Sequence, residues 1–356
     1  MNTSDRFHRL ILSIAVSVGA VALGSAASAR DLPLCHMIAT GGTIAMKIDP
    51  VKNAAVPALS GEDLLASVPE LEKVATIHVD NPFNVPSTEM DPQRWVLTQQ
   101  AVVRGLGNSK VAGVIVSHGT DTLEETAWFL DLTVASDKPI VLVGAQRNAS
   151  ERDSDGPRNL LNAARVCVSA AARGKGAMIV LNNQINAARE VTKTHTSDVE
   201  TFKSGDFGFL GTVDQDRVVF YRSPSRRQHV PLLDKKLPRV DIVPMYAGAD
   251  GTLVRAAVVT GAKGLVIQAT GWGNVNIPMF DAIKEAIDGG TIVVISTRVH
   301  NGRVLPMYGF KGSGKSLKEA GAVFADNLSP QKARILLMLA LQSTSNAEEI
   351  QQVFDR

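Results

Sequence analysis

Short apolar runs alternate along the chain with longer segments in which apolar residues recur at helical spacing. The runs contain too few polar residues to leave one face in water, which is typical of strands buried on both faces. Strands of this kind, each followed by a helix, predict a mostly parallel sheet with helices on both sides. In the first half of the chain the runs are Cys35–Thr40, Val111–Val116, Lys138–Ala145 and Gly176–Leu181.

Start signals mark several of the helices between these strands. The signals are the pair Ser60 and Asp63, the N-cap Asp91 before Pro92, the capping box of Thr122 with Glu125, and Pro157. In parallel sheets of this class, ligands bind beyond the carboxyl ends of the strands. We therefore expect a functional site in the loops after Thr40 and Val116.

Residues 221–238 interrupt the alternation with charged and proline-rich sequence that has no periodicity, which is typical of a linker. Beyond them the alternation resumes, with strands expected at 240–246, 264–269 and 291–297, and helices at 252–262, at 279–287, from Pro330 and from Asn346. The predicted fold is α/β: a larger N-terminal mostly parallel sheet with flanking helices (30–222), a linker (223–238) and a smaller C-terminal α/β domain (239–356).

The first 29 residues have the pattern of a secretory signal peptide. Arg6 and Arg9 precede the apolar stretch 10–23, and Ala27-Ser28-Ala29 offers the small residues that a signal peptidase requires. The alternative is a membrane anchor, but a run of about fourteen residues is short for a span of roughly twenty. We expect cleavage after Ala29 and export to a bacterial periplasm, with no later segment apolar enough to span a bilayer.

Composition narrows the function classes. The 356 residues are 45% hydrophobic and 20% charged, which is typical of globular domains. With 37 basic and 35 acidic residues and only 5% aromatics, nothing favours nucleic acid or a membrane surface as a partner. Cys35 and Cys167 lie in apolar runs, where buried free thiols are common; a bridge between them is possible, but their spacing does not support it. The seven histidines are scattered without a metal-binding motif.

Two loops at predicted strand ends carry hydroxyl groups. Thr40-Gly41-Gly42-Thr43-Ile44 combines paired glycines with the Thr43 hydroxyl, and residues 118–122 (HGTDT) place hydroxyls and a carboxylate in one turn. Each has a simpler explanation, a plain turn for the first and a helix N-cap for the second. A threonine needs a base to act as a nucleophile. Lys193 is a candidate if it is desolvated, and otherwise an ordinary surface charge.

These two loops together resemble the signature motifs of bacterial type II L-asparaginases and glutaminase-asparaginases. The resemblance continues in order through residues 84–87 (NVPS), 143–145 (VGA), 191–194 (VTKT) and 329–334 (SPQKAR), and so covers nearly the whole mature chain. It implies hydrolysis of the side-chain amide of L-asparagine through a threonyl acyl-enzyme, without a metal or organic cofactor. It also implies a homotetramer with sites between subunits.

Carried over by position, the resemblance makes Thr43 the acylated nucleophile. Thr120, Asp121 and Lys193 would form a second catalytic group, and Thr120 would also touch the substrate. The remaining positions implied for substrate binding are Ser87 and Asp121 for the α-carboxylate and α-ammonium, the backbone of Gly42, Thr43 and Ala145 as oxyanion donors, and Asn274 from a neighbouring subunit.

The chain departs from the family in one respect. The family places a tyrosine on a mobile lid after the nucleophile, whereas residues 45–61 contain none. Lys47 and Asp49 are polar enough to replace it, but nothing in the spacing selects them. Pro50 and Pro57 predict a stiff lid. We expect Thr120 and Lys193 to supply the proton relay.

Three alternatives stay open at this stage. Gly309–Ser316 matches a phosphate-loop pattern, although a flexible glycine loop is the better interpretation, because Pro306 interrupts the segment where a strand should end. A non-catalytic periplasmic amino-acid binding protein would share the signal peptide and two α/β domains. Within the amidohydrolases, asparagine and glutamine differ by one methylene, worth about 1–3 kcal/mol of discrimination. We expect asparagine as the substrate and glutamine as a slower one.

Overall fold

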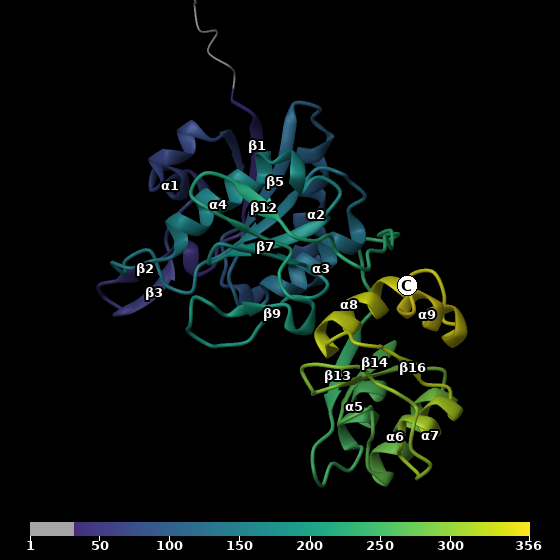
Figure 1. Ribbon diagram of the computed structural model, residues 1–356. Coiled ribbons are helices and arrows are strands. Elements are labelled where there is room, and N and C mark those ends of the chain that lie inside the picture. The colour runs from purple at the N-terminus through teal and green to yellow at the C-terminus, as the bar shows by residue number, and fades with distance from the viewer. Residues whose placement is uncertain (1–31) are drawn as a thin grey trace, which may run out of the picture. The chain divides into compact units, whose positions relative to one another are not determined.

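The structure, a computed structural model, describes residues 32–356. The predicted signal peptide lies outside the described residues. The first half of the chain builds an eight-stranded sheet from β1 (Leu34–Ala39), β4 (Thr76–Asp80), β5 (Val111–Ser117), β6 (Ile140–Val143), β7 (Ala177–Leu181), β8 (Gln184–Ala187), β11 (Gly211–Val213) and β12 (Val218–Phe220) (Figure 1). Their order across the sheet is β12-β11-β8-β7-β6-β5-β1-β4.

Five neighbouring strands run parallel, in the spatial order β4, β1, β5, β6 and β7. The strands β8, β11 and β12 are antiparallel to their neighbours. From β1 the chain first pairs outward with β4 and then returns to the other side of β1 to form β5. This reversal makes the crevice between the carboxyl ends of β1 and β5 the switch point at which such sheets bind ligands. The register places Ala39 opposite Ser117, and Ser117 opposite Val143.

Helices cover both faces of this sheet, as the apolar runs predicted. They are α1 (Gly61–Ala66), α2 (Pro92–Gly107), α3 (Leu123–Thr133) and α4 (Gly156–Val168). Alternate strand residues face opposite sides: Met37 and Ile115 pack in the core that contains α1 and α4, whereas Ile38 and Val116 pack in the core that contains α2 and α3. Short 3-10 helices lie at η1 (Thr43–Ala45), η2 (Pro69–Lys73), η3 (Ser87–Glu89), η4 (Ala170–Ala172) and η5 (Gly205–Phe207).

The predicted helix starts at Ser60, Asp91 and Thr122 hold, but one of the predicted side-chain caps does not. Ser60 and Asp63 form the reciprocal capping box, and the Asp91 carboxylate accepts from the backbone N–H of Arg94. The capping box expected at Thr122 is wrong. The Thr122 hydroxyl instead donates to the carbonyl of Ser87 at 2.7 Å, because the η3 turn packs against this loop. This bond ties two of the predicted site segments together.

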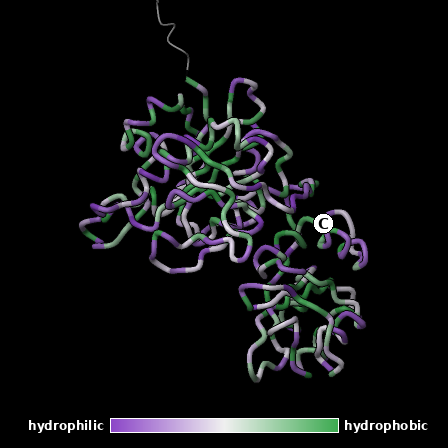
Figure 2. The backbone as a smooth tube through the Cα atoms, in the orientation of Figure 1, coloured by the Kyte–Doolittle hydropathy of each residue, from purple (hydrophilic) through white to green (hydrophobic). Residues whose placement is uncertain are grey.

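The second half of the chain forms a smaller parallel sheet, which confirms the predicted α/β class. Its strands, in spatial order, are β13 (Val240–Pro244), β14 (Gly264–Ala269), β15 (Ile292–Thr297) and β16 (Val323–Phe324). Its helices are α5 (Thr252–Val259), α6 (Ile277–Asp288), α7 (Gly314–Glu319), α8 (Pro330–Ala340) and α9 (Ala347–Phe354). In both halves the most hydrophobic segments run through the interior, around the sheet strands (Figure 2). Residues 221–239 contain no helix or strand.

Two hairpins complete the described structure: β2 (Met46–Asp49) with β3 (Ala54–Pro57), and β9 (Thr192–Lys193) with β10 (Phe202–Lys203). No helix within residues 32–356 is long and apolar enough to cross a bilayer.

The glycine-rich segment 309–316 does not form a phosphate loop; its residues 309–313 form a loop that leads into a helix. Residues 303–309 form no strand, and α7 begins at Gly314. The Ser313 side chain accepts from the backbone N–H of Ser316, so the Ser-Gly-Lys-Ser sequence is a helix N-cap.

Cys35 and Cys167 form a disulfide that joins β1 to α4, with their Cα atoms 6.6 Å apart. Burial of both residues was expected, but their spacing did not indicate that they meet. The sheet register explains the contact. Gly113 lies opposite Cys35 on β5, and a Cβ at Gly113 would stand only 3.2 Å from the Cys167 Sγ, so the glycine leaves the room that the bridge occupies.

Candidate active site

The loops singled out by the sequence follow neighbouring strands at the switch point. The backbone N–H of Thr40 donates to the Ser117 carbonyl at 3.1 Å, and that of His118 donates to the Val143 carbonyl at 2.9 Å. The loops after β1, β5 and β6 therefore lie in a row along one edge of the sheet, as the ligand-binding rule for parallel sheets requires.

Glycines let these loops pack backbone against backbone. Gly42 has a φ of 85°, and a Cβ at this position would lie 2.1 Å from the backbone nitrogen of Gly119. A Cβ at Gly119 would in turn lie 2.7 Å from the Ser87 Oγ. The structure thus brings Gly42, Ser87 and the 118–122 loop together. The N–H of Gly42, which was expected to be an oxyanion donor, donates to the Val85 carbonyl at 3.1 Å.

Thr43 begins the short helix η1 directly after this close approach, and its side chain is half-buried. A Cβ on Gly156 would contact both Ile44 and Ala145, at 3.2 and 3.6 Å, so Ala145 lies beside the Thr43 turn. Among residues 32–356 the backbone N–H groups of Thr43 and Ala145 have no hydrogen-bond acceptor. These two N–H groups thus have no partner within the described residues, whereas that of Gly42 has one.

Lys193 links the second set of predicted residues. Its Nζ donates to the Thr120 hydroxyl at 2.9 Å and to the Asp121 carboxylate at 2.7 Å. Thr120 is 4% exposed, whereas the side chain of Asp121 is 60% exposed. The Asp121 carboxylate is therefore exposed to solvent, whereas the Thr120 hydroxyl is buried. A cavity of about 380 Å³ opens next to these residues, lined by Asp121, Lys193, His195 and their neighbours.

A buried carboxylate holds Lys193 in place. Glu124, on α3 and 4% exposed, accepts the backbone N–H of Lys193 at 2.7 Å. Its other oxygen accepts from the Gln331 side chain at 2.8 Å, at the start of α8. Helix α8 belongs to the smaller sheet, so residues of the C-terminal half position Lys193 in the N-terminal half.

The hairpin β2–β3 occupies the place of the expected lid. Its Met46 carbonyl accepts from the N–H of Ala149, and the N–H of Ile48 donates to the Ser150 hydroxyl at 3.0 Å. These bonds pin the hairpin to the 146–155 loop. Within residues 32–356 no group hydrogen bonds to the Thr43 hydroxyl, and neither Lys47 nor Asp49 does so.

Sequence reasoning gave His118 no role. It is fully buried, and burial lowers its pKa to about 4, so the ring is neutral at ordinary pH. Its Nδ1 lies 2.7 Å from the Gly119 carbonyl, which can only accept, so Nδ1 carries the proton. Nε2 then accepts from the Thr126 hydroxyl at 2.9 Å, and Trp95 donates to the same hydroxyl. His118 thus orients Gly119 against Gly42.

Asn274 is not brought to this site within the chain. Its side-chain oxygen accepts the N–H of Gly314 at 3.2 Å, and its carbonyl accepts that of Thr270. Its described contacts support the start of α7.

Comparisons with known proteins indicate one family over most of the chain. Residues 35–226 match the family described as Asparaginase, N-terminal, and residues 239–354 match the Glutaminase/Asparaginase C-terminal domain. L-asparaginase 2 of Bacillus subtilis is 39% identical over 94% of this chain and 89% of its own length. The probable periplasmic L-asparaginase of Haemophilus influenzae is 38% identical over 93% and 95%.

A solved structure agrees as well. The crystal structure of a probable cytoplasmic L-asparaginase from Campylobacter jejuni superposes with a TM-score of 0.82 at 36% identity, over 91% of this chain and 99% of that one. The chain belongs to the asparaginase family. The enzyme is accordingly an amidohydrolase of the L-asparaginase class.

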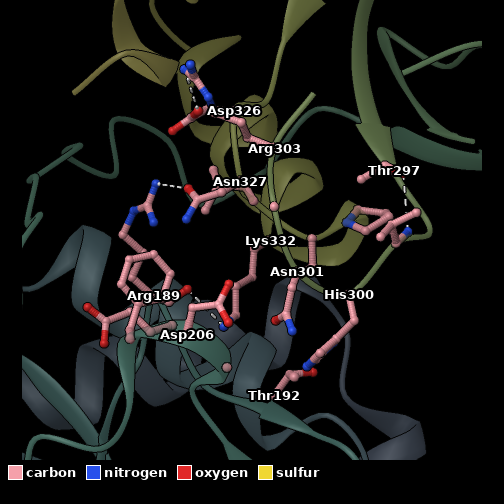
Figure 3. A pocket seen from close by; sticks show the side chains of 18 of the residues that line it. Arg189, Thr192, Asp206, Thr297, His300, Asn301, Arg303, Asp326, Asn327 and Lys332 are labelled. Carbon is pink, nitrogen blue, oxygen red and sulfur yellow. Dashed lines mark hydrogen bonds and ion pairs between the residues drawn. The ribbon is translucent and has the colours of Figure 1, made fainter. Parts of the chain in front are cut away.

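A cavity of about 540 Å³ contains none of the predicted asparaginase site residues (Figure 3). It lies where the 297–303 segment faces Arg189 and Asp206. Lys332, 3% exposed, donates from its wall to the carbonyls of Arg189 and Val191, and burial lowers its pKa to about 8. These bonds hold the segment that leads into Lys193.

The structure also adds Gln146 and Glu124, which sequence reasoning did not name. Gln146 follows directly on the Val143-Gly144-Ala145 motif, and Glu124 stands in the helix after residues 118–122. Their positions beside the motifs were a signal, but a glutamine and a helix-start glutamate have no pattern that marks them as site residues.

Proposed function

We propose that the enzyme hydrolyses the side-chain amide of L-asparagine to L-aspartate and ammonia, with Thr43 as the nucleophile. The observation that carries this proposal is the hydrogen bonding of Lys193 to both Thr120 and Asp121 at the switch point, next to the loop that presents Thr43. A hydroxyl needs such a neighbour, because threonine alone is a weak nucleophile.

In the first step the Thr43 Oγ bonds to the amide carbon, and the proton of the hydroxyl passes through the Thr120–Lys193 relay to the amide nitrogen, which leaves as ammonia. In the second step a water adds to the ester and releases aspartate and free Thr43. The N–H groups of Thr43 and Ala145 stabilise the oxyanion in both steps, since neither has an acceptor among residues 32–356.

Substrate binding follows from the remaining groups. Ser87, buried beside Gly119, and the exposed carboxylate of Asp121 bind the α-carboxylate and α-ammonium of the substrate, and Thr120 contacts it between them. Glutamine is a slower substrate, because its additional methylene displaces the amide carbon from Thr43.

We also propose that the mature enzyme is periplasmic, released by cleavage after Ala29. The Cys35–Cys167 disulfide supports export, since disulfides persist in oxidising compartments. The name of the Haemophilus influenzae relative supports it as well, although that of the Campylobacter jejuni structure is cytoplasmic. In the proposed homotetramer, Asn274 of a neighbouring subunit contacts the α-ammonium.

Ammonia release from L-asparagine and L-glutamine tests the proposal. We expect turnover of asparagine that vanishes in Thr43→Ala and survives partly in Thr43→Ser, which keeps the hydroxyl. Saturable asparagine binding without ammonia release would identify a non-catalytic amino-acid binding protein instead.

A further inference from the structure

Gln146 is held in one orientation at the end of β6. Its backbone N–H donates to the Asp155 carboxylate, at 3.1 Å to one oxygen and 3.2 Å to the other. Its side-chain Nε2 donates to the Asp198 carbonyl at 3.1 Å. A carbonyl can only accept, so this bond fixes which end of the amide is nitrogen. The oxygen Oε1 must point the other way.

That oxygen meets Thr120. The Thr120 hydroxyl lies 2.9 Å from the Gln146 Oε1, and the Lys193 Nζ lies 2.9 Å from the same hydroxyl. Both Oε1 and Nζ have a fixed role: the amide oxygen accepts and the ammonium donates. Thr120 therefore donates its one proton to Gln146 and accepts from Lys193. The Thr120 methyl group packs over Gly144, and a Cβ at Gly144 would lie 3.2 Å from that methyl carbon.

We propose that Gln146 is a positioning residue for catalysis: it fixes the rotamer and the proton of Thr120, so that the lone pairs of this hydroxyl face Lys193. In this resting arrangement the Thr120 proton points at Gln146, which cannot take it up, so Thr120 does not serve as the nucleophile. During the relay Lys193 acts in its amine form: the Thr120 proton passes to the Lys193 Nζ while Thr120 takes up the proton of Thr43. Thr43, whose hydroxyl has no such partner among residues 32–356, is left as the attacking group. This inference rests on the proposed function and assigns the two threonines their separate roles.

Two substitutions at Gln146 distinguish a role in positioning Thr120 from a role in packing alone. Gln146→Met keeps the volume and loses the acceptor, and Gln146→Glu keeps an acceptor but adds a negative charge. The Asp198 carbonyl freed by either change belongs to an exposed residue and can bind water, so folding should survive. Gln99→Met on α2 is a matched control, since within residues 32–356 the Gln99 side chain hydrogen bonds only to the Thr133 carbonyl, at 3.4 Å.

We expect Gln146→Met to lower kcat for asparagine about tenfold or more with little change in KM, and Gln99→Met to leave both unchanged. In Gln146→Glu the acid limb of the pH–rate profile should move to higher pH, because a carboxylate beside Thr120 favours the ammonium form of Lys193. The titratable groups already facing Lys193 are Asp121, Glu124, Glu125 and His195, and they are the same in every variant.

A kcat of Gln146→Met equal to that of the wild type would overturn the inference. So would a loss that follows the melting temperature, together with an unmoved pH profile in Gln146→Glu, because that result describes packing alone. Failure of the proposed function would look different, since the wild-type enzyme itself would then release no ammonia.

Discussion

The Lys193 ammonium and the Thr120 hydroxyl are 2.9 Å apart, although they come from different parts of the N-terminal sheet region. Thr120 belongs to the loop after β5, and Lys193 belongs to the β9–β10 hairpin that follows β8. Helix α3 joins the two, because its Glu124 accepts the backbone N–H of Lys193. From the sequence alone, Lys193 could be an ordinary surface charge. In the structure its side chain is only 17% exposed.

Removing the ammonium tests its role. We expect Lys193→Met to lower kcat for asparagine by about 10²- to 10⁴-fold, the usual range for a lost proton-transfer group, with a small change in KM. Lys193→Arg keeps the charge, but arginine does not give up its proton in proteins, so this variant should lose nearly as much. Steady-state ammonia release measures both, and near-normal turnover in Lys193→Met would contradict the relay.

Gly42 should tolerate no side chain. Its positive φ is unfavourable for other residues, and the added Cβ would meet the Gly119 backbone at 2.1 Å. We expect Gly42→Ala to abolish activity and to lower the melting temperature. The control is Gly107→Ala at the end of α2, where no atom of residues 32–356 outside the adjoining helix backbone and the two chain neighbours lies within 4 Å of the new Cβ. Alanine should stabilise there by about 0.5–1 kcal/mol. An active Gly42→Ala enzyme would contradict the close approach of the two loops.

The disulfide should contribute strongly to stability. It closes a loop of 132 residues, for which the chain-entropy relation gives about 5 kcal/mol. We expect the Cys35→Ala, Cys167→Ala double variant to unfold at lower denaturant concentration than the wild type, and a reducing agent to lower the midpoint of the wild type only. Equal midpoints with and without the disulfide would show that the bridge is absent or contributes nothing.

His118 should make the fold sensitive to acid. Its pKa is about 4 in the folded protein and near 6.5 when unfolded, so the unfolded state binds the proton first. Stability is therefore retained above pH 6.5 and lost progressively as the pH falls from 6.5 to 4, by up to about 3 kcal/mol at roughly 1.4 kcal/mol per pKa unit.

The matching variant is His118→Gln, which has no titrating ring. Thermal melts between pH 4 and 7 should show a smaller loss of stability in the variant than in the wild type. Parallel losses in the two proteins would mean that other groups cause the acid sensitivity.

Much of the fold follows from local sequence because its signals are local. Strands such as Val111–Ser117 are apolar on both faces, and Ser60 and Asp91 cap their helices through residues three positions away. The site motifs follow strands at the switch point, so their meeting could be expected from the parallel order alone.

Other features depend on contacts between segments that are far apart in the chain, and no local sequence pattern predicts such contacts. The Thr122 hydroxyl bonds to Ser87, and Cys35 meets Cys167 only once α4 lies over β1. In the 309–316 segment the glycines did not indicate that Ser313 would cap α7. The contact of Gln146 with Thr120 likewise exists only in three dimensions.

The central claim is that Lys193 acts through Thr120 as a single unit beside Thr43. The most direct measurement compares kcat/KM for asparagine in Thr120→Val, Lys193→Met and the double variant. Residues that act as one unit are strongly non-additive. The account predicts that the double variant is no slower than the slower single variant. Losses that multiply in the double variant would show that the two residues act independently and would contradict the relay.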